Sequence, residues 1–285
     1  MMHLTFSRFC CIIMMKNRYQ KNGGRNQMDN SCIFWFSGTG NSLHAAKRLS
    51  GELGGIPLAQ ITDEPPADAV GGEGAKIGFV FPSYFGNMPR AVRAFVEKID
   101  IKPGTYIFCA VTMGAVGQGS VGALKNALKA KGLRLNYGRG IVMPANYVLM
   151  YNPADPKKSE GKIEKAEKKI SGMAAGISSG KQSVRTLPVT AKNLYKNIGS
   201  LDAEFKAGDG CTGCGLCEKI CPVKNIRLES GKPEWLHHCE HCMGCISWCP
   251  AKAIDYGSRT QSRNRYCNPK IKADEMTHDE KTPAV

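Results

Sequence analysis

Eight cysteines in two runs carry the clearest chemistry in this chain. In each run three cysteines are separated by two residues, and a fourth follows after three more residues, directly before a proline. The first run is Cys211, Cys214, Cys217 and Cys221 with Pro222, and the second is Cys239, Cys242, Cys245 and Cys249 with Pro250. Thiolates at this spacing are typical of 4Fe–4S ligation, in which the fourth cysteine of each run binds the other cluster. Each proline ends the local turn.

The reach of the chain predicts two clusters that exchange their fourth ligands. Three cysteines spaced by two residues wrap one cluster, each thiolate on a different iron, whereas the fourth cannot curl back to it. One 4Fe–4S cluster is then expected on Cys211, Cys214, Cys217 and Cys249. The second is expected on Cys239, Cys242, Cys245 and Cys221. The alternatives are structural zinc, which usually takes two cysteine pairs, and a disulfide framework.

The other cysteines and the nearby histidines are interpreted as bystanders. Five cysteines show no ligand spacing and are expected to be buried or incidental thiols: Cys10, Cys11, Cys32, Cys109 and Cys267. Three histidines crowd the second run: His237, His238 and His241. Because eight thiolates are available, these histidines are expected beside the cluster or exposed, and not as ligands.

Length, composition and charge set the outer bounds. The 285 residues allow about two domains, and 42% apolar residues can form a sizeable core. An odd total of thirteen cysteines and two sets of cluster ligands indicate a reducing compartment. The apolar runs are too short to predict a membrane span. The net charge is +15, but no basic motif interleaved with aromatic residues accompanies it. An acidic redox protein is therefore favoured over nucleic acid as a partner.

Residues 1–29 differ from the rest of the chain. The apolar stretch 9–15 is short, and its basic residues, including Lys16 and Arg18, follow it. A secretory signal has its charges before the apolar core and small residues at a cleavage site after it. We interpret this segment as a disordered extension or an over-extended gene start, with Met28 as the natural start.

A second chemical motif lies at residues 37–42. The aromatic-rich run 32–36 predicts a buried parallel strand, and helical spacing resumes at 44–49. A strand, a loop of small residues and a helix N-terminus form an anion site, because free N–H groups and the helix dipole converge there. The loop lacks the GxxxxGK[ST] and GxGxxG patterns, so a monophosphate is favoured over an NTP or a dinucleotide. His44 is expected on the helix face and not as a ligand.

The sequence of this loop resembles the FMN phosphate loop of flavodoxins. Its residues are Ser37, Gly38, Thr39, Gly40, Asn41 and Ser42. Further strands are predicted at 76–81, 106–112 and 133–142, and helices at 91–99, 121–131 and 159–177. The resemblance implies an α/β fold with a flavodoxin-like, doubly wound parallel sheet, and FMN at the switch point beyond the strand carboxyl ends.

The same resemblance implies two loops around the flavin ring. The first contains Pro82, Ser83, Tyr84, Phe85 and Gly86. The second contains Thr112, Met113, Gly114, Gly117 and Gly119. Tyr84 is the candidate for stacking on the ring, and the glycines would let the backbone approach its edge. The alternatives are that Tyr84 packs under its own turn and that the glycines serve turn geometry. Tyr147 and Tyr151 could cover the flavin or pack a loop.

These motifs divide the chain into modules. Residues 30–179 are the predicted flavodoxin-like domain, 180–207 a linker with a short helix at 189–198, and 258–285 a basic tail over the domain junction or a partner site. Residues 208–257 are a small α+β ferredoxin-like domain. It buries little apolar surface, so the clusters must supply much of its folding energy. Its two cysteine runs resemble an internal duplication.

Residues 30–269 together resemble bacterial and archaeal proteins that fuse a flavodoxin-like domain to a two-cluster ferredoxin. The likeness includes Pro233, Trp235 and the basic stretch ending at Tyr266. It implies an anaerobic, cytoplasmic electron carrier that passes electrons between two 4Fe–4S clusters, FMN and an external ferredoxin or reductase. One alternative is an FMN enzyme that reduces a small molecule, with the clusters as its electron feed. A redox-sensing regulator is another, although the sequence identifies no DNA-binding module.

Overall fold

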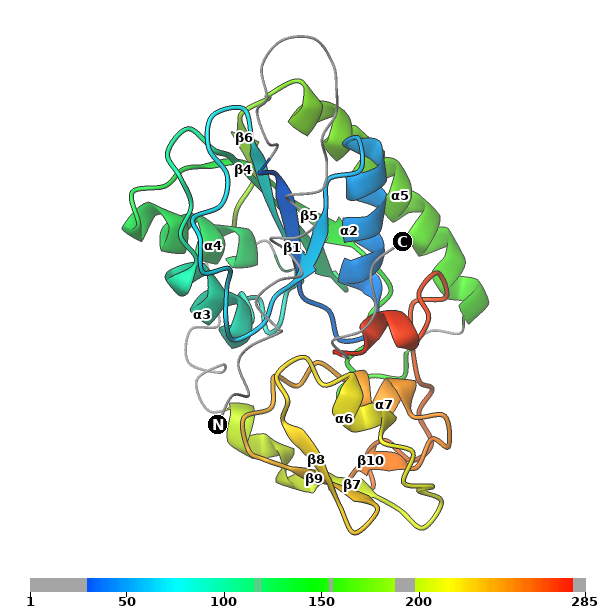
Figure 1. The fold of residues 1–285 in the computed structure, drawn as a ribbon. Helices are drawn as coiled ribbons and strands as arrows, with labels where there is room; N and C mark the ends of the chain where they lie inside the picture. Colours follow the sequence, from blue (N-terminus) through cyan, green and yellow to red (C-terminus); the bar gives the residue numbers. More distant parts are fainter. Residues whose placement is uncertain (1–29, 116, 118, 154–155, 188–197, 279–285) are drawn as a thin grey trace, which may run out of the picture.

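The computed structural model describes residues 30–278, except 116, 118, 154–155 and 188–197. The extension 1–29 and nearly all of the helix expected at 189–198 lie outside the described residues. Figure 1 shows a larger domain built around one sheet and a smaller domain below it, with the last described segment between them. Within the described ranges, no helix combines the length and the apolar character needed to cross a bilayer.

The larger domain is a parallel sheet of six strands in the order β2-β1-β3-β4-β5-β6. The strands are β1 (Cys32–Trp35), β2 (Leu58–Gln60), β3 (Lys76–Pro82), β4 (Tyr106–Met113), β5 (Leu135–Val142) and β6 (Ser183–Val184). The order of the first five is that of flavodoxins, with the switch point between β1 and β3. The predicted fold class is therefore confirmed. The short strands β2 and β6 were not expected from the sequence.

Four helices cover the two faces of this sheet. They are α2 (Asn41–Glu52), α3 (Arg90–Lys98), α4 (Gly119–Ala130) and α5 (Pro156–Ser178). Helices α2 and α5 lie on one face, and α3 and α4 lie on the other (Figure 1). Phe34 of β1 packs against Phe95 of α3, with ring centroids 5.1 Å apart, whereas its neighbour Ile33 belongs to the α2 and α5 side. Alternate residues of the strand thus fill both cores, as expected for a buried parallel sheet.

His44 lies on the face of α2 that packs against α5. Its ring is 5% exposed, and Nε2 is 3.0 Å from Oε1 of Glu167 on α5. Burial lowers the pKa of His44 from its ordinary value of 6.5, more than the carboxylate of Glu167 raises it. The residue is therefore part of a helix contact, as the sequence predicted.

This histidine should make the larger domain less stable in acid. Because the pKa of His44 is lower in the folded state than in the unfolded state, the unfolded chain takes up the proton first as the pH falls through 6.5. The resulting loss is at most about 1.4 kcal/mol per pH unit for one proton. In anaerobic thermal melts, the Tm should fall further between pH 7.5 and pH 5.5 for the wild type than for His44→Gln. Equal drops would contradict the assignment.

The smaller domain consists of short elements around the cysteine runs. Strand β7 (Phe205–Ala207) pairs antiparallel with β10 (Ile254–Tyr256), and β8 (Ile226–Glu229) forms a hairpin with β9 (Lys232–Trp235). The helices are α6 (Leu216–Lys219) and α7 (Gly244–Trp248). The segment predicted as a linker contributes β6 to the large sheet, and the 3-10 helix Ile198–Glu204 and β7 to the small domain.

The backbone of the two cysteine runs repeats, in agreement with the predicted duplication. The residues before α6 and α7 are both left-handed, with φ 75° at Gly215 and 63° at Met243. A second pair, Gly213 and His241, has φ 67° and 51°. The first run thus uses glycine where the second uses side chains that are buried in the small domain, 1% exposed at Met243 and 2% at His241. Burial of these side chains offsets the strain of the left-handed backbone.

Candidate iron–sulfur centres

The eight cysteines line two cavities of nearly equal size. Cavity I has an empty volume of about 350 Å³ and is lined by Cys211, Cys214, Cys217 and Cys249. Cavity II has an empty volume of about 330 Å³ and is lined by Cys221, Cys239, Cys242 and Cys245. In both cavities the fourth cysteine comes from the other run, which is the grouping that the reach of the chain predicts. Iron binding by these thiols remains a prediction.

Four cysteines line each cavity. In the part of the chain that the structure describes, no three His, Cys, Asp or Glu side chains are grouped closely enough to hold a single metal ion. A structural zinc site needs four ligands about 2.0–2.3 Å from one centre. A 4Fe–4S cluster binds each thiolate to a different iron, so its sulfur ligands stand further apart. The choice of clusters over zinc rests on the cysteine spacing and on the fourth cysteine that each cavity takes from the other run.

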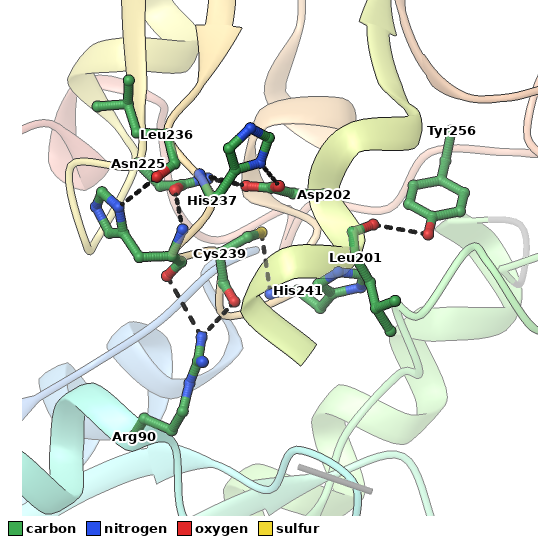
Figure 2. Close-up of polar contacts among 10 residues, drawn as sticks. Arg90, Leu201, Asp202, Asn225, Leu236, His237, Cys239, His241 and Tyr256 are labelled. Atoms are coloured by element: carbon green, nitrogen blue, oxygen red, sulfur yellow. Dashed lines mark hydrogen bonds and ion pairs between the residues drawn. The ribbon is translucent and has the colours of Figure 1, made fainter. Parts of the chain in front are cut away.

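Backbone N–H groups point at the sulfurs of cavity II. The amide of Asn225 donates to Cys221 Sγ at 3.2 Å. The amide of His241 donates to Cys239 Sγ at 3.2 Å (Figure 2). Such bonds favour the thiolate form. Burial nevertheless raises the pKa of Cys239 to about 12 in the protein without iron. Assembly of a cluster in this cavity must therefore release protons as the iron takes up the thiolates.

The two cavities differ in their access to solvent. Cys214 of cavity I is exposed, and the other three cysteines there are partly exposed. In cavity II, Cys221, Cys242 and Cys245 are each 8% exposed. Cys239, the fourth cysteine of cavity II, is partly exposed. Cavity I therefore has the more exposed cysteines, and cavity II, lined by small-domain residues alone, has the more buried ones.

Glu240, between two cysteines of cavity II, joins the two domains. Its carboxylate is 3% exposed and accepts the backbone N–H groups of Arg90 at 3.2 Å and Ala91 at 3.0 Å, at the N-terminus of α3. The Arg90 side chain donates to Glu240. It also donates to the carbonyl of Cys239 (Figure 2). A carboxylate at a helix N-terminus satisfies free N–H groups and the helix dipole. Sequence analysis did not identify this residue, and its position inside the cysteine run is the signal that could have flagged it.

A buried carboxylate, Asp202, orders the chain before Cys239. It is fully buried and accepts the backbone N–H of His237 at 3.1 Å, while its other oxygen lies 2.7 Å from His237 Nδ1 (Figure 2). Asn225 donates to Asp202 and accepts the backbone N–H of His238. None of the three histidines is among the residues that line cavity II, and whether they stay beside a bound cluster remains a prediction. Asp202 lies in the predicted linker, where no sequence signal marks it.

Residues 210–254 match the family model of the 4Fe-4S dicluster domain. The large sheet has the flavodoxin strand order. The chain joins a flavodoxin-like domain to a 4Fe–4S dicluster domain. No curated protein matches it significantly.

Solved structures similar to the larger domain are distant. A protein from Bacteroides eggerthii assigned as a flavoprotein is 17% identical, covers 47% of this chain and 96% of its own, and has a TM-score of 0.32. A Bacteroides uniformis protein with the same assignment is 16% identical, with coverage of 47% and 97% and a TM-score of 0.32. A short-chain flavodoxin associated with a bacterial microcompartment is 15% identical, with coverage of 52% and 97% and a TM-score of 0.36. The fold assignment rests on the strand order.

The loop expected to hold the FMN phosphate lies between β1 and α2, where the sequence places it. All six of its residues, 37–42, are buried. Thr39 Oγ1 accepts Asn146 Nδ2 at 2.8 Å, and Ser42 Oγ is 2.7 Å from Thr112 Oγ1. Asn41 Oδ1 accepts the hydroxyl of Tyr266 at 2.8 Å. The polar side chains expected to face a phosphate are therefore bonded within the protein.

In the first of the two loops expected around the flavin ring, Tyr84 is buried and the other four residues are partly exposed. Tyr84 is 8% exposed, lies in the core on the α3 and α4 side, and contacts Phe36 edge-on with ring centroids 6.5 Å apart. Phe85 contacts Tyr147 edge-on at 5.3 Å. Pro82 ends β3, and Gly86 has a left-handed φ of 72° with open space around it. The structure favours the packing alternative for Tyr84.

The second ring loop is buried at Thr112, Met113 and Gly117 and exposed at Gly114. Thr112 and Met113 are buried at the end of β4, and Gly119 begins α4. A Cβ at Gly117 would meet Ser83 Oγ at 2.5 Å, and one at Gly114 would meet Ala145 Cβ at 2.9 Å. Both glycines therefore allow a close approach of other protein atoms, which is the turn-geometry alternative. The polar side chains of loop 37–42 are bonded within the protein and so do not fit a phosphate as they are placed. The contacts expected between a flavin ring and the other two loops stay a prediction.

Proposed function

We propose that this chain is an electron-transfer protein that carries single electrons on two 4Fe–4S clusters, one in each cavity. The observation that supports this most strongly is the pair of four-cysteine cavities with exchanged fourth ligands. Clusters of this type accept and release one electron at a time, at potentials tuned by hydrogen bonds to sulfur and by solvent exposure. The flavodoxin-like domain then serves as the scaffold on which the cysteine loop of cavity II, residues 239–245, is packed.

Electron exchange with partner proteins takes place at cavity I in this proposal. Its cysteine Cys214 is exposed, whereas three of the four cysteines of cavity II are buried. The partner is a ferredoxin or a reductase with an acidic docking surface, because the chain has a net charge of +15. Association should then weaken as the ionic strength rises, since salt screens exposed charges.

Iron and acid-labile sulfide analysis of the anaerobically purified protein tests the proposal, together with EPR after dithionite reduction. We expect about eight irons and eight sulfides per chain, and the EPR signals of reduced 4Fe–4S clusters that lie close together. Stoichiometric zinc, or iron without labile sulfide, would overturn it.

The difference in exposure predicts that the clusters are lost at different rates. A chelator that removes iron after mild oxidation should act first on cavity I, because Cys214 gives it access. Iron release should therefore show two phases of similar amplitude, with the slower at least about tenfold slower, since residues 239–245 pack on the larger domain and local opening must expose the buried cysteines of cavity II. Release in a single phase would contradict the assigned exposure.

A further inference from the structure

The phosphate-type loop 37–42 is covered by other segments of the same chain. A Cβ at Gly38 would lie 2.4 Å from the carbonyl oxygen of Cys242 and 2.7 Å from its Cβ. A Cβ at Gly40 would lie 3.1 Å from the Cβ of Asn268 and 3.2 Å from that of Ile271. The first contact comes from the cavity II loop, defined as residues 239–245, and the second from the C-terminal tail. Both glycines thus mark places where another part of the chain reaches the loop.

Hydrogen bonds hold these segments on the loop. Trp248, in α7 after the cavity II loop, donates Nε1–H to the carbonyl of Gly38 at 3.0 Å. The backbone N–H of Asn268 donates to the carbonyl of Thr39 at 2.8 Å. Trp248 and Asn268 come from the small domain and the tail, and Figure 1 shows the tail in red between the two domains. The loop is therefore the point where both join the large domain.

A phosphate in such a loop needs the same space. Its oxygens must come within hydrogen-bond distance, about 2.7–3.2 Å, of the loop amides. The main chain of Cys242 lies against Gly38, and the side chain of Asn146 lies between Thr39 and Cys242, with Nδ2 2.8 Å from Thr39 Oγ1 and 3.5 Å from the Cys242 carbonyl. A flavin phosphate would have to displace these groups.

We propose that loop 37–42 is the docking site of the cavity II loop and of the tail. This docking and the binding of a flavin phosphate exclude each other. The inference goes beyond the proposed function, because it concerns what the flavodoxin-like domain binds and not what the clusters do. In this chain, the loop positions a redox centre by receiving protein backbone. The purified protein then carries iron but no flavin.

Flavin analysis of the anaerobically purified protein tests the exclusion. We expect less than about 0.1 FMN per chain and no saturable binding in a titration with micromolar FMN, a range in which a working site would fill. One tightly bound FMN per chain would overturn the inference. Iron and sulfide are measured on the same sample, so the inference and the proposed function can fail separately.

A pair of glycine variants tests the docking of the cavity II loop on loop 37–42. Gly38→Ala places a methyl group against the Cys242 carbonyl, whereas Gly51→Ala, on α2, meets nothing within 4 Å. We expect Gly38→Ala to speed the slow phase of iron release about tenfold or more, because burial of cavity II depends on docking. Gly51→Ala should match the wild type. Equal slow phases in both variants would overturn the proposal.

A milder variant covers the case in which Gly38→Ala does not fold. Trp248→Phe keeps an aromatic ring and removes the hydrogen bond from Nε1 to the Gly38 carbonyl. The slow phase of iron release should become about fivefold faster, as expected for the loss of one net hydrogen bond. An unchanged slow phase would contradict the role of the loop as a docking site.

Discussion

Replacing Cys249 by alanine should remove the cluster from cavity I, although Cys249 belongs to the second cysteine run. It lines cavity I with the triplet of the first run, so its loss opens that cluster and leaves the ligands of cavity II complete. Iron should fall from about eight to about four per chain. A chelator should then remove the remaining iron from the protein in the slow phase, because cavity II has the more buried cysteines.

The reciprocal variant and a third cysteine complete this experiment. Cys221→Ala should also leave about four irons, but in the fast phase, because the cluster in exposed cavity I remains. Cys267→Ala is the control, since Cys267 lines neither cavity and contacts the carbonyl of Ser247. The exchanged ligation would be wrong if Cys249→Ala removed the slow phase and kept the fast one. Unfolding of the small domain would instead remove both phases.

Replacing Glu240 by glutamine should loosen the contact between the domains. Two backbone N–H groups at the start of α3 point at this carboxylate, which is 3% exposed, and Arg90 approaches it at 3.4 Å. Glutamine has a similar size but no charge, and its NH₂ group cannot accept from one of these N–H groups. Loss of a buried, charged hydrogen-bond acceptor costs about 1–3 kcal/mol. Since 1.4 kcal/mol is about a factor of ten, iron should leave cavity II about 5- to 150-fold faster.

Glu234 offers a matched control for this variant. It lies on β9, its side chain is 55% exposed, and it is 3.8 Å from Arg227. Exposed ion pairs of this kind contribute little to stability, so Glu234→Gln should leave both phases of iron release unchanged. If Glu240→Gln behaved like Glu234→Gln, the carboxylate at the start of α3 would not hold the domains together.

The cysteine grouping could be predicted because it depends on short-range geometry. A loop of three cysteines spaced by two residues can reach around one cavity, and a fourth after three more residues cannot, whatever the rest of the chain does. The parallel sheet was predictable for a similar reason, since buried strands and helices alternate along the sequence with the periodicity of each element. The strands β2 and β6 escaped prediction because they have three and two residues. Such short strands exist only through pairing with a neighbour.

The use of loop 37–42 was decided by tertiary structure. A strand, a loop of Ser, Gly and Thr, and a helix N-terminus suit a phosphate, but the same bare glycine backbone also admits another stretch of main chain. The choice depends on residues far apart in the sequence: Gly38 meets Cys242, Gly40 meets Asn268, and Glu240 meets the start of α3. The sequence by itself thus determined how the eight cysteines are divided between cavities I and II, and the fold of the larger domain. What fills the phosphate-type loop was settled only when the two domains packed together, because no local pattern encodes a contact between distant segments.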